Sequence, residues 1–305
     1  MRALVTGGAG FIGSHIVDAL IRDGHAVLVI DDLSRGRREQ VNPRADFTQM
    51  SVTASAFAAA VGSWHPDVIF HQAAQIDVRH SVADPLADAE ANVVGTVNVL
   101  HASTMHNVKR VVFASSGGAI YGDADVIPTP ETQTPEPESP YGTSKLCAEA
   151  YGGMFQRMRD LDFIALRYAN VYGPRQDPHG EAGVVAIFAE RLLRGETATI
   201  NGDGTQTRDY VYVEDVVAAN LAALDAAAPE RFNIGTGIET NVNQIYQRLR
   251  TVLGCEAEAV HGPPKPGEQQ RSCLSIDHAR ETLGWEPQTQ LDEGLRRTAD
   301  FFRTR

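Results

Sequence analysis

Cysteine is scarce in this sequence. Three cysteines occur in 305 residues, at positions 147, 255 and 273, and none forms a CxxC pair or a Cys/His spacing typical of a metal site. These observations argue against a disulfide framework and a structural zinc site, predict no bound metal, and fit a reducing compartment. The sequence also lacks an 18-residue apolar run and a signal-peptide pattern ahead of its first strand-like segment. We therefore expect a cytoplasmic protein with no membrane partner.

Positive charge is also in short supply. Lysine and arginine total 27 against 39 for aspartate and glutamate, which gives a net charge of −12. A general nucleic-acid binder would carry the opposite balance, so we expect no nucleic-acid partner. The remaining composition, 43% hydrophobic and 22% charged, is that of a globular protein long enough to bury a substantial core without staples.

Short apolar runs alternate with helical patterns through the first 170 residues. Apolar runs without polar alternation indicate parallel strands that are buried on both faces. Alternating strands and helices predict an α/β fold with a doubly wound, Rossmann-type parallel sheet. The predicted strands lie at 3–5, 26–30, 67–70, 110–114 and 163–167, and the long helices at 11–21, 87–105 and 140–158.

The pattern changes after residue 170. Proline- and glycine-containing loops separate shorter helices, which we predict at 184–193, 213–224 and 242–252. We therefore expect a first domain over 1–170 and a smaller mixed lobe over 171–305, with some strands and helices of the lobe returning to the first domain.

Glycines follow the first predicted strand at a regular spacing. Gly7, Gly10 and Gly13 permit a tight turn and close approach of a pyrophosphate, and the helix that follows offers free N–H groups to phosphate. Phe11 and Ile12 belong to the same turn. Because the turn joins a strand to a helix, it predicts a dinucleotide site rather than an empty glycine turn.

Acidic residues end the second predicted strand. Asp31 stands 18 positions after Gly13, where a carboxylate accepts hydrogen bonds from the adenosine ribose and repels a 2′-phosphate. Arg35 could accept that phosphate, but the adjacent Asp32 adds a second negative charge. The pattern therefore predicts NAD rather than NADP.

A YxxxK motif begins the predicted helix at 140–158. Tyr141 and Lys145 share one helix face, so the ammonium group can lower the pKa of the phenol, which then acts as a base. Ser115 and Ser116 follow an apolar strand, whose end lies where ligands bind in such sheets. We predict Ser116, Tyr141 and Lys145 as the catalytic residues, with Ser115 as the second choice for the serine.

Nine ordered motifs give the chain a family resemblance over nearly its full length. It resembles the extended short-chain dehydrogenases/reductases, and within them the nucleotide-sugar 4-epimerases. The motifs are TGGAGFIGSH (6–15), HQAA (71–74), NVVGT (92–96), SSGGAIYG (115–122), YGTSK (141–145), RYANVYGP (167–174), NGDGTQTRDYVYVEDV (201–216), FNIGTG (232–237) and PGE (266–268).

The resemblance implies NAD-dependent 4-epimerisation of a UDP-hexose through a transient 4-ketosugar. NAD stays bound, Tyr141 takes the proton of the sugar 4-hydroxyl, and the hydride returns to the other face. A homodimer joined by the helices at 87–105 and 140–158 is also implied. By resemblance the further cofactor residues are Ser51, Val52, Ala73, Ala74, Asn92, Lys145 and Tyr168. The substrate residues are Ser116, Asn170, Val184, Asn201, Arg208, Glu268, Arg271 and Ser272.

Some positions depart from the family pattern. Ser51 and Val52 stand where the family usually has an adenine-contacting aspartate, and Asn201 stands where an aromatic residue often stacks on uracil. Related dehydratases and decarboxylases place a carboxylic acid beside the catalytic serine, whereas this chain has Gly117 and Gly118. This difference disfavours dehydration and decarboxylation, and so favours epimerisation. The alternative is another nucleotide-sugar enzyme of the same family, such as a uronic acid epimerase, a dehydratase or a reductase. A non-catalytic NAD-binding regulator is a remote alternative, since Tyr141 and Lys145 are intact.

The width of the sugar pocket is predicted from one position. Ser272 aligns with a tyrosine of enzymes strict for glucose and galactose. A small side chain leaves room for an N-acetyl group, so we hypothesise that UDP-N-acetylglucosamine and UDP-N-acetylgalactosamine are also substrates.

Overall fold

A seven-stranded parallel sheet forms the centre of the computed structural model, which describes residues 1–179, 183–227, 230–265 and 269–304. The strand order is β10-β6-β5-β4-β1-β2-β3, and every neighbouring pair is parallel. The predicted doubly wound sheet is confirmed. Its strands are β1 (Arg2–Thr6), β2 (Ala26–Asp31), β3 (Asp46–Gln49), β4 (Val68–His71), β5 (Arg110–Ser116), β6 (Asp162–Tyr168) and β10 (Arg231–Ile234).

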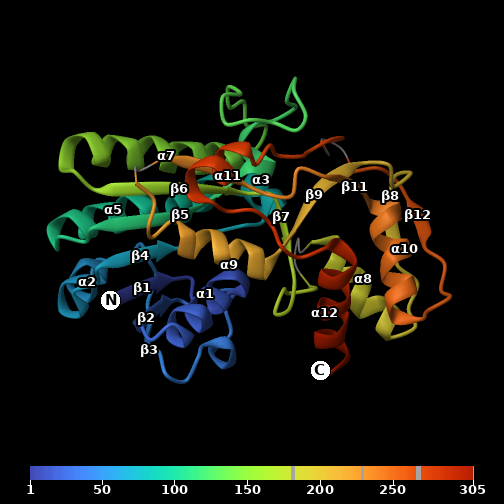
Figure 1. Cartoon of the computed structure of the whole chain (residues 1–305), viewed down its shortest axis with the longest axis horizontal. Coiled ribbons are helices and arrows are strands. Elements are labelled where there is room, and N and C mark those ends of the chain that lie inside the picture. The colour runs from blue at the N-terminus through green and yellow to red at the C-terminus, as the bar shows by residue number, and fades with distance from the viewer. Residues whose placement is uncertain (180–182, 228–229, 266–268, 305) are drawn as a thin grey trace.

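Helices cover both faces of this sheet (Figure 1). One apolar cluster joins the sheet to α1 (Phe11–Arg22), α9 (Val213–Ala222) and α11 (Asp277–Leu283). A second joins the opposite face to α2 (Phe57–Trp64), α5 (Gly95–Met105) and α7 (Pro140–Arg159). The apolar runs that predicted the strands are therefore buried from both sides, as Leu4 and Val5 show with no exposed surface.

The helix predicted at 87–105 is a composite. It begins two residues earlier as α4 (Pro85–Ala89), passes through the π-helical turn η2 (Glu90–Val94) and continues as α5. Asp84 caps α4 through its side chain, and Pro85 occupies the first turn, where its missing N–H costs nothing. The remaining short helical elements are η1 (Arg38–Gln40), α3 (Val78–Ala83) and α6 (Gly117–Ile120).

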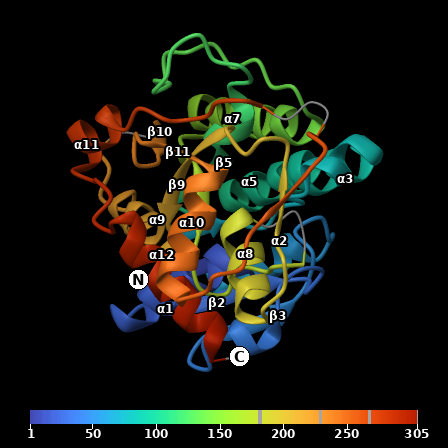
Figure 2. The ribbon, with the colours of Figure 1, turned by 90° about the vertical axis from the view of Figure 1, so that its right-hand side faces the viewer.

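The smaller lobe packs beside the carboxyl edge of the sheet, at the right of Figure 1 and facing the viewer in Figure 2. Its core joins Phe188, Tyr246 and Leu295 from three helices with residues of its strands. The strands are β7 (Asn170–Tyr172), β9 (Thr207–Tyr212) and β11 (Glu239–Asn241) in one sheet, and β8 (Thr199–Asn201) with β12 (Val260–Gly262) in another. The helices are α8 (Val184–Leu193), α10 (Val242–Leu253) and α12 (Leu291–Arg303).

Elements from beyond residue 170 complete the large sheet. β10 pairs with β6, and α9 and α11 cover the sheet beside α1. Part of the chain beyond residue 170 therefore returns to the large sheet, and the division into a first domain and a smaller lobe at residue 170 stays a prediction. Among the described residues, no helix is both long and apolar enough to cross a lipid bilayer.

Candidate active site

Three functional segments meet at one edge of the sheet. β1, β4 and β5 are neighbours in register, with Thr6 opposite His71 and His71 opposite Phe113. Their carboxyl ends lead into the glycine turn, the 72–75 segment and the serine loop. Ligands of doubly wound sheets bind at this edge.

The glycine turn is built as the sequence predicts. Gly7 has a φ of +68°, and a Cβ there would lie 2.6 Å from the backbone nitrogen of Ala73. A Cβ on Gly13 would collide with the carbonyl oxygen of Gly7. Helix α1 begins at Gly10 without a side-chain cap, so its first N–H groups stay available to an anion. These features fit the pyrophosphate of NAD, and they place Ala73 beside the turn, with Ala74 following it in the chain.

The two aspartates after β2 have different environments. The carboxylate of the buried Asp31 accepts hydrogen bonds from the backbone nitrogens of Ala9, at 2.9 Å, and Leu33, at 2.8 Å. Burial raises the pKa of Asp31, while these two hydrogen bonds oppose the shift. Asp32 instead accepts from Ser34 within its own loop. Asp31 is therefore the carboxylate that faces the glycine turn, as a ribose ligand must.

Tyr141 and Lys145 lie on the first two turns of α7. Pro140 starts the helix, and the Ser139 hydroxyl accepts from the Gly142 nitrogen at 3.1 Å. The Tyr141 side chain hydrogen-bonds Ser116. Lys145 Nζ donates to the carbonyl oxygen of Ala114 at 2.8 Å and lies 5.8 Å from the Tyr141 ring centroid.

Burial has opposite effects on the two groups. It raises the pKa of Tyr141 to about 12, although the hydrogen bond from Ser116 opposes the rise. It lowers the pKa of Lys145 to about 8. Both shifts favour the neutral forms of the two side chains. Added positive charge beside the Tyr141 phenol would lower its pKa, so more of the ionised phenol would be present to act as a base.

Ser115 and Ser116 have separate roles in the packing. Ser115 Oγ donates to Glu149 Oε1 at 2.6 Å inside the protein. Glu149 also receives two hydrogen bonds from Arg167, a guanidinium with no exposed surface. Ser116 is the serine that reaches Tyr141. The geometry therefore supports the first choice of Ser116, and its catalytic role stays a proposal.

Asn92 braces the segment that approaches the glycine turn. Its Oδ1 accepts from the Gln75 nitrogen, and its Nδ2 donates to the Gln75 carbonyl, each at 2.9 Å. The same Nδ2 donates to Asp88 Oδ1 at 3.0 Å. Both amide hydrogens of Asn92 are thus used inside the protein, and the side chain fixes the backbone at Gln75.

The other predicted cofactor residues lie around the same edge. Ser51 follows β3 and hydrogen-bonds Thr53, while Val52 is buried. The Tyr168 hydroxyl at the end of β6 accepts from Asn220 and Gln72, and burial raises the pKa of Tyr168 to about 12.

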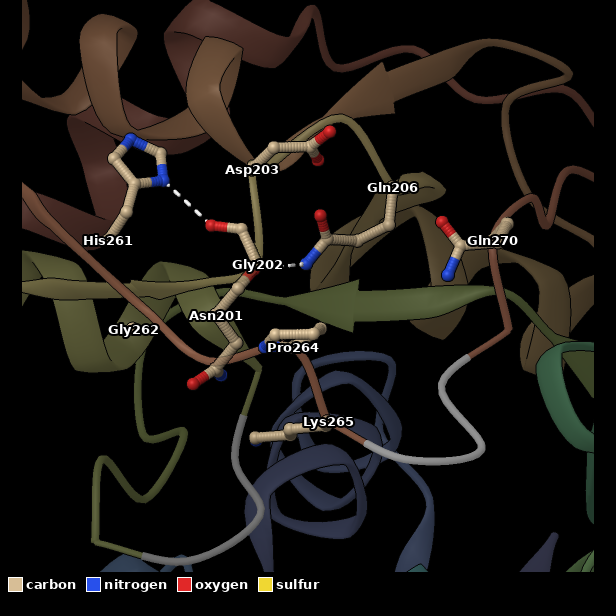
Figure 3. A pocket seen from close by; sticks show the side chains of 9 residues that line it. All are labelled: Asn201, Gly202, Asp203, Gln206, His261, Gly262, Pro264, Lys265 and Gln270. Atoms are coloured by element: carbon tan, nitrogen blue, oxygen red, sulfur yellow. Dashed lines mark hydrogen bonds between the residues drawn. The ribbon is translucent and has the colours of Figure 1, made fainter.

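A hollow in the smaller lobe contains one predicted substrate residue, Asn201. Figure 3 shows its nine lining residues, which come from β8, the turn after it, residues 261–265 and Gln270. The hollow encloses about 710 Å³, which is ample for a nucleotide. His261 Nδ1 hydrogen-bonds the Gly202 carbonyl at 2.8 Å and joins the two walls.

The remaining predicted substrate residues come from several elements. Arg208 lies on β9 and donates to the carbonyl of Thr207 at 2.7 Å. Asn170 Oδ1 lies 3.8 Å from where a Cβ on Gly118 would stand. Val184 begins α8 and is half-buried, and Ser272 is buried. Glu268 falls outside the described residues.

Arg271 is the predicted phosphate ligand with a competing partner. It forms a two-point ion pair with Glu239, and the Arg271 side chain is 59% exposed. The pair uses Nε and Nη2 of Arg271, so binding of phosphate by this same edge of the guanidinium would require release from Glu239.

Two features of the site were missed by the sequence analysis. Asp88 precedes Asn92 by four residues on one helical run, a spacing that could have indicated their contact. The Glu149–Arg167 pair joins positions distant in sequence and had no such signal. Among the described residues, no group of three or more His, Cys, Asp or Glu side chains could hold a metal ion.

Comparison with known proteins shows which family the chain belongs to. The model of the NAD dependent epimerase/dehydratase family matches residues 3–235. The UDP-glucose 4-epimerase of Mycolicibacterium smegmatis is 47% identical, over 100% of this chain and 99% of its own.

Solved structures give the same result. The UDP-glucose 4-epimerase of Thermotoga maritima, solved with UDP-glucose, is 50% identical with a TM-score of 0.98, covering 100% of this chain and 99% of its own. The UDP-glucose 4-epimerase of Thermus thermophilus, in complex with NAD, is 43% identical with a TM-score of 0.95, covering 99% of each chain. With its glycine turn, Tyr141 and Lys145 meeting at one sheet edge, the chain belongs to the NAD dependent epimerase/dehydratase family.

Proposed function

We propose that this protein is an NAD-dependent 4-epimerase that interconverts UDP-glucose and UDP-galactose. The observation that carries the proposal is the contact of Tyr141 with Ser116, with the buried ammonium group of Lys145 5.8 Å from the Tyr141 ring centroid. NAD supplies the nicotinamide ring that accepts and returns the hydride. Tyr141 exchanges the proton of the sugar 4-hydroxyl, and Ser116 orients that hydroxyl.

The serine loop supports epimerisation over water loss. Gly117 and Gly118 follow Ser116, and a side chain at Gly118 would have space on the Asn170 side. A dehydration step needs a carboxylic acid close to the sugar there, and these glycines supply none. The 4-ketosugar therefore loses no water. It rotates in the site and takes the hydride back on its other face.

The test follows the sugars by proton NMR with no added cofactor. Purified protein incubated with UDP-glucose should form UDP-galactose without a net change in NAD. Tyr141→Phe should keep the fold and lower turnover by about 10²-fold or more, because the proton-transfer group is removed. A wild-type protein that forms no UDP-galactose even with added NAD would overturn the proposal.

We also propose that N-acetylated UDP-sugars are accepted. Ser272 lies between Gln270, which lines the hollow, and Leu274, which packs where a Cβ on Gly117 would stand. This supports a place for Ser272 near the sugar. Ser272→Tyr should lower activity on UDP-N-acetylglucosamine about 10-fold or more while sparing UDP-glucose. Equal loss on both substrates would contradict the pocket-size argument.

A homodimer is the proposed assembly. Large apolar side chains are exposed on the neighbouring helices α3, α4 and α7: Val82 64%, Leu86 82%, Tyr151 41% and Met158 69%. Such an apolar face supports an interface with a second copy.

The three cysteines, none in a disulfide, support a cytoplasmic location.

Sedimentation velocity tests the assembly. Leu86→Glu should convert dimer into monomer, whereas Ile238→Glu changes a side chain that is 65% exposed elsewhere and should leave the dimer intact. A wild-type protein that sediments as a monomer would contradict the proposal.

A further inference from the structure

Asp88 is a buried carboxylate held by neutral groups. It is 1% exposed, and its Oδ1 accepts from Gln75 Nε2 at 2.9 Å and Asn92 Nδ2 at 3.0 Å. Within the described part of the chain, no salt bridge joins it to a lysine, arginine or histidine. A buried charge is costly without a counter-charge, so the protein must balance Asp88 in another way.

Lys145 is a buried positive charge, which is also costly without a counter-charge. It is 3% exposed, and its ammonium group donates to a neutral carbonyl. The ionisable groups that act on it are Asp88 from α4, Glu149 from its own helix and His71 from β4. Arg167 already neutralises Glu149 through two hydrogen bonds. His71 is neutral near pH 7, because burial lowers its pKa to about 3.

The packing brings Asp88 to the Lys145 region of α7. Helix α4 packs against α7, and Asp88 and Ser144 line one hollow of about 540 Å³ between them. Ser144 directly precedes Lys145. The other carboxylates nearby, Glu138 in the same hollow and Glu90 on η2, are exposed to water, which screens them.

We infer that Asp88 is a positioning residue of this site: it balances the buried ammonium charge of Lys145 and, through Asn92 and Gln75, fixes the backbone beside the glycine turn. The inference rests on the proposed function, because it concerns the same catalytic pair. The negative charge of Asp88 raises the pKa of both Lys145 and Tyr141. Its removal should therefore lower both.

The chain offers a direct measurement of this effect. It contains three lysines, at 109, 145 and 265. Labelling lysine with ¹³C at Cε lets NMR follow each ammonium group against pH in the purified protein, with Lys109→Arg and Lys265→Arg variants to assign the signals. Asp88→Asn keeps the side-chain shape and removes the charge, so the midpoint of Lys145 should fall by about half a pH unit or more.

Two matched variants complete the experiment. Asp84→Asn removes an exposed carboxylate from the start of the same helix, where asparagine caps equally well, and should leave the Lys145 midpoint unchanged. Asp88→Glu keeps the charge and should also preserve the midpoint. Turnover needs the ionised phenol of Tyr141 and the ammonium form of Lys145, so both pH limbs belong to the pair and should move to lower pH in Asp88→Asn, where both pKa values fall.

Each outcome decides the inference. An unchanged Lys145 midpoint in a folded Asp88→Asn protein overturns it, and so does a lower rate with unmoved pH limbs. If Asp88→Asn does not fold, Asp88→Glu decides, because a midpoint lowered by half a unit despite the retained charge overturns the inference. Wild-type protein that forms no UDP-galactose contradicts the proposed function, while the NMR titration still tests Asp88.

Discussion

Glu149 and Arg167 illustrate how single residues hold β6 to α7, the helix that carries Tyr141 and Lys145. Both side chains are almost completely buried, and Arg167 also donates to the Tyr121 hydroxyl at 2.7 Å. Glu149→Gln leaves Arg167 as a buried charge without its partner, which should lower the free energy of unfolding by about 3–5 kcal/mol. Urea unfolding measures the change. Asp292→Asn, in the exposed pair with Arg248, should cost no more than about 1 kcal/mol, and an equal loss in both variants would contradict the argument.

A second single residue, His71, makes the stability of the fold depend on pH. Its ring hydrogen-bonds Thr6 at 2.7 Å and Thr96 at 3.0 Å, and burial lowers its pKa to about 3. In the unfolded chain this histidine takes a proton below about pH 6.5, while the folded protein resists protonation. Its contribution to stability is therefore present above pH 6.5 and is lost as pH falls toward 3. His71→Asn should show a weaker fall in urea midpoint between pH 7 and pH 4.5 than the wild type, and parallel falls would exclude this role.

The glycine turn and α1 act together at the scale of elements. Gly13→Ala adds a Cβ that collides with the Gly7 carbonyl, so the turn must open. We expect NAD affinity to fall about 10-fold or more in equilibrium binding. Gly153→Ala, also in a helix, meets only the flexible end of Arg157 at 3.3 Å and should leave NAD affinity unchanged. Equal affinity in both variants would show that the turn does not depend on this close approach.

Elements with strong local signals could be predicted from the sequence. β1, β2, β4 and β5 carry uninterrupted apolar runs, and the boundaries predicted for α8 are confirmed. β3 was missed because it is an edge strand, Asp46–Gln49, with only half-buried or exposed residues. The Glu149–Arg167 pair was missed because its two charges are distant in sequence and only the fold brings them together. Asp88 was missed because its spacing to Asn92 indicates their contact but not the burial of the carboxylate.

Two separate parts of the chain contribute strands to the main sheet. β10 extends the sheet beside β6, and α9 covers Leu166 and Ile164 in one apolar cluster. A fragment of residues 1–170 would expose that face and leave β6 as an open edge. We expect this fragment to aggregate or bind a hydrophobic dye, whereas the full chain unfolds in one cooperative transition. A soluble 1–170 fragment with native circular dichroism would instead support an independent first domain.

The central claim is that hydride leaves and returns to C4 of the sugar within one active site. The direct measurement uses UDP-glucose with deuterium at C4, incubated in ordinary water with no added cofactor. We predict UDP-galactose that keeps the deuterium at C4, because the cofactor returns the same atom while Tyr141 handles only the hydroxyl proton. UDP-galactose carrying solvent hydrogen at C4, or no UDP-galactose at all, would contradict the account.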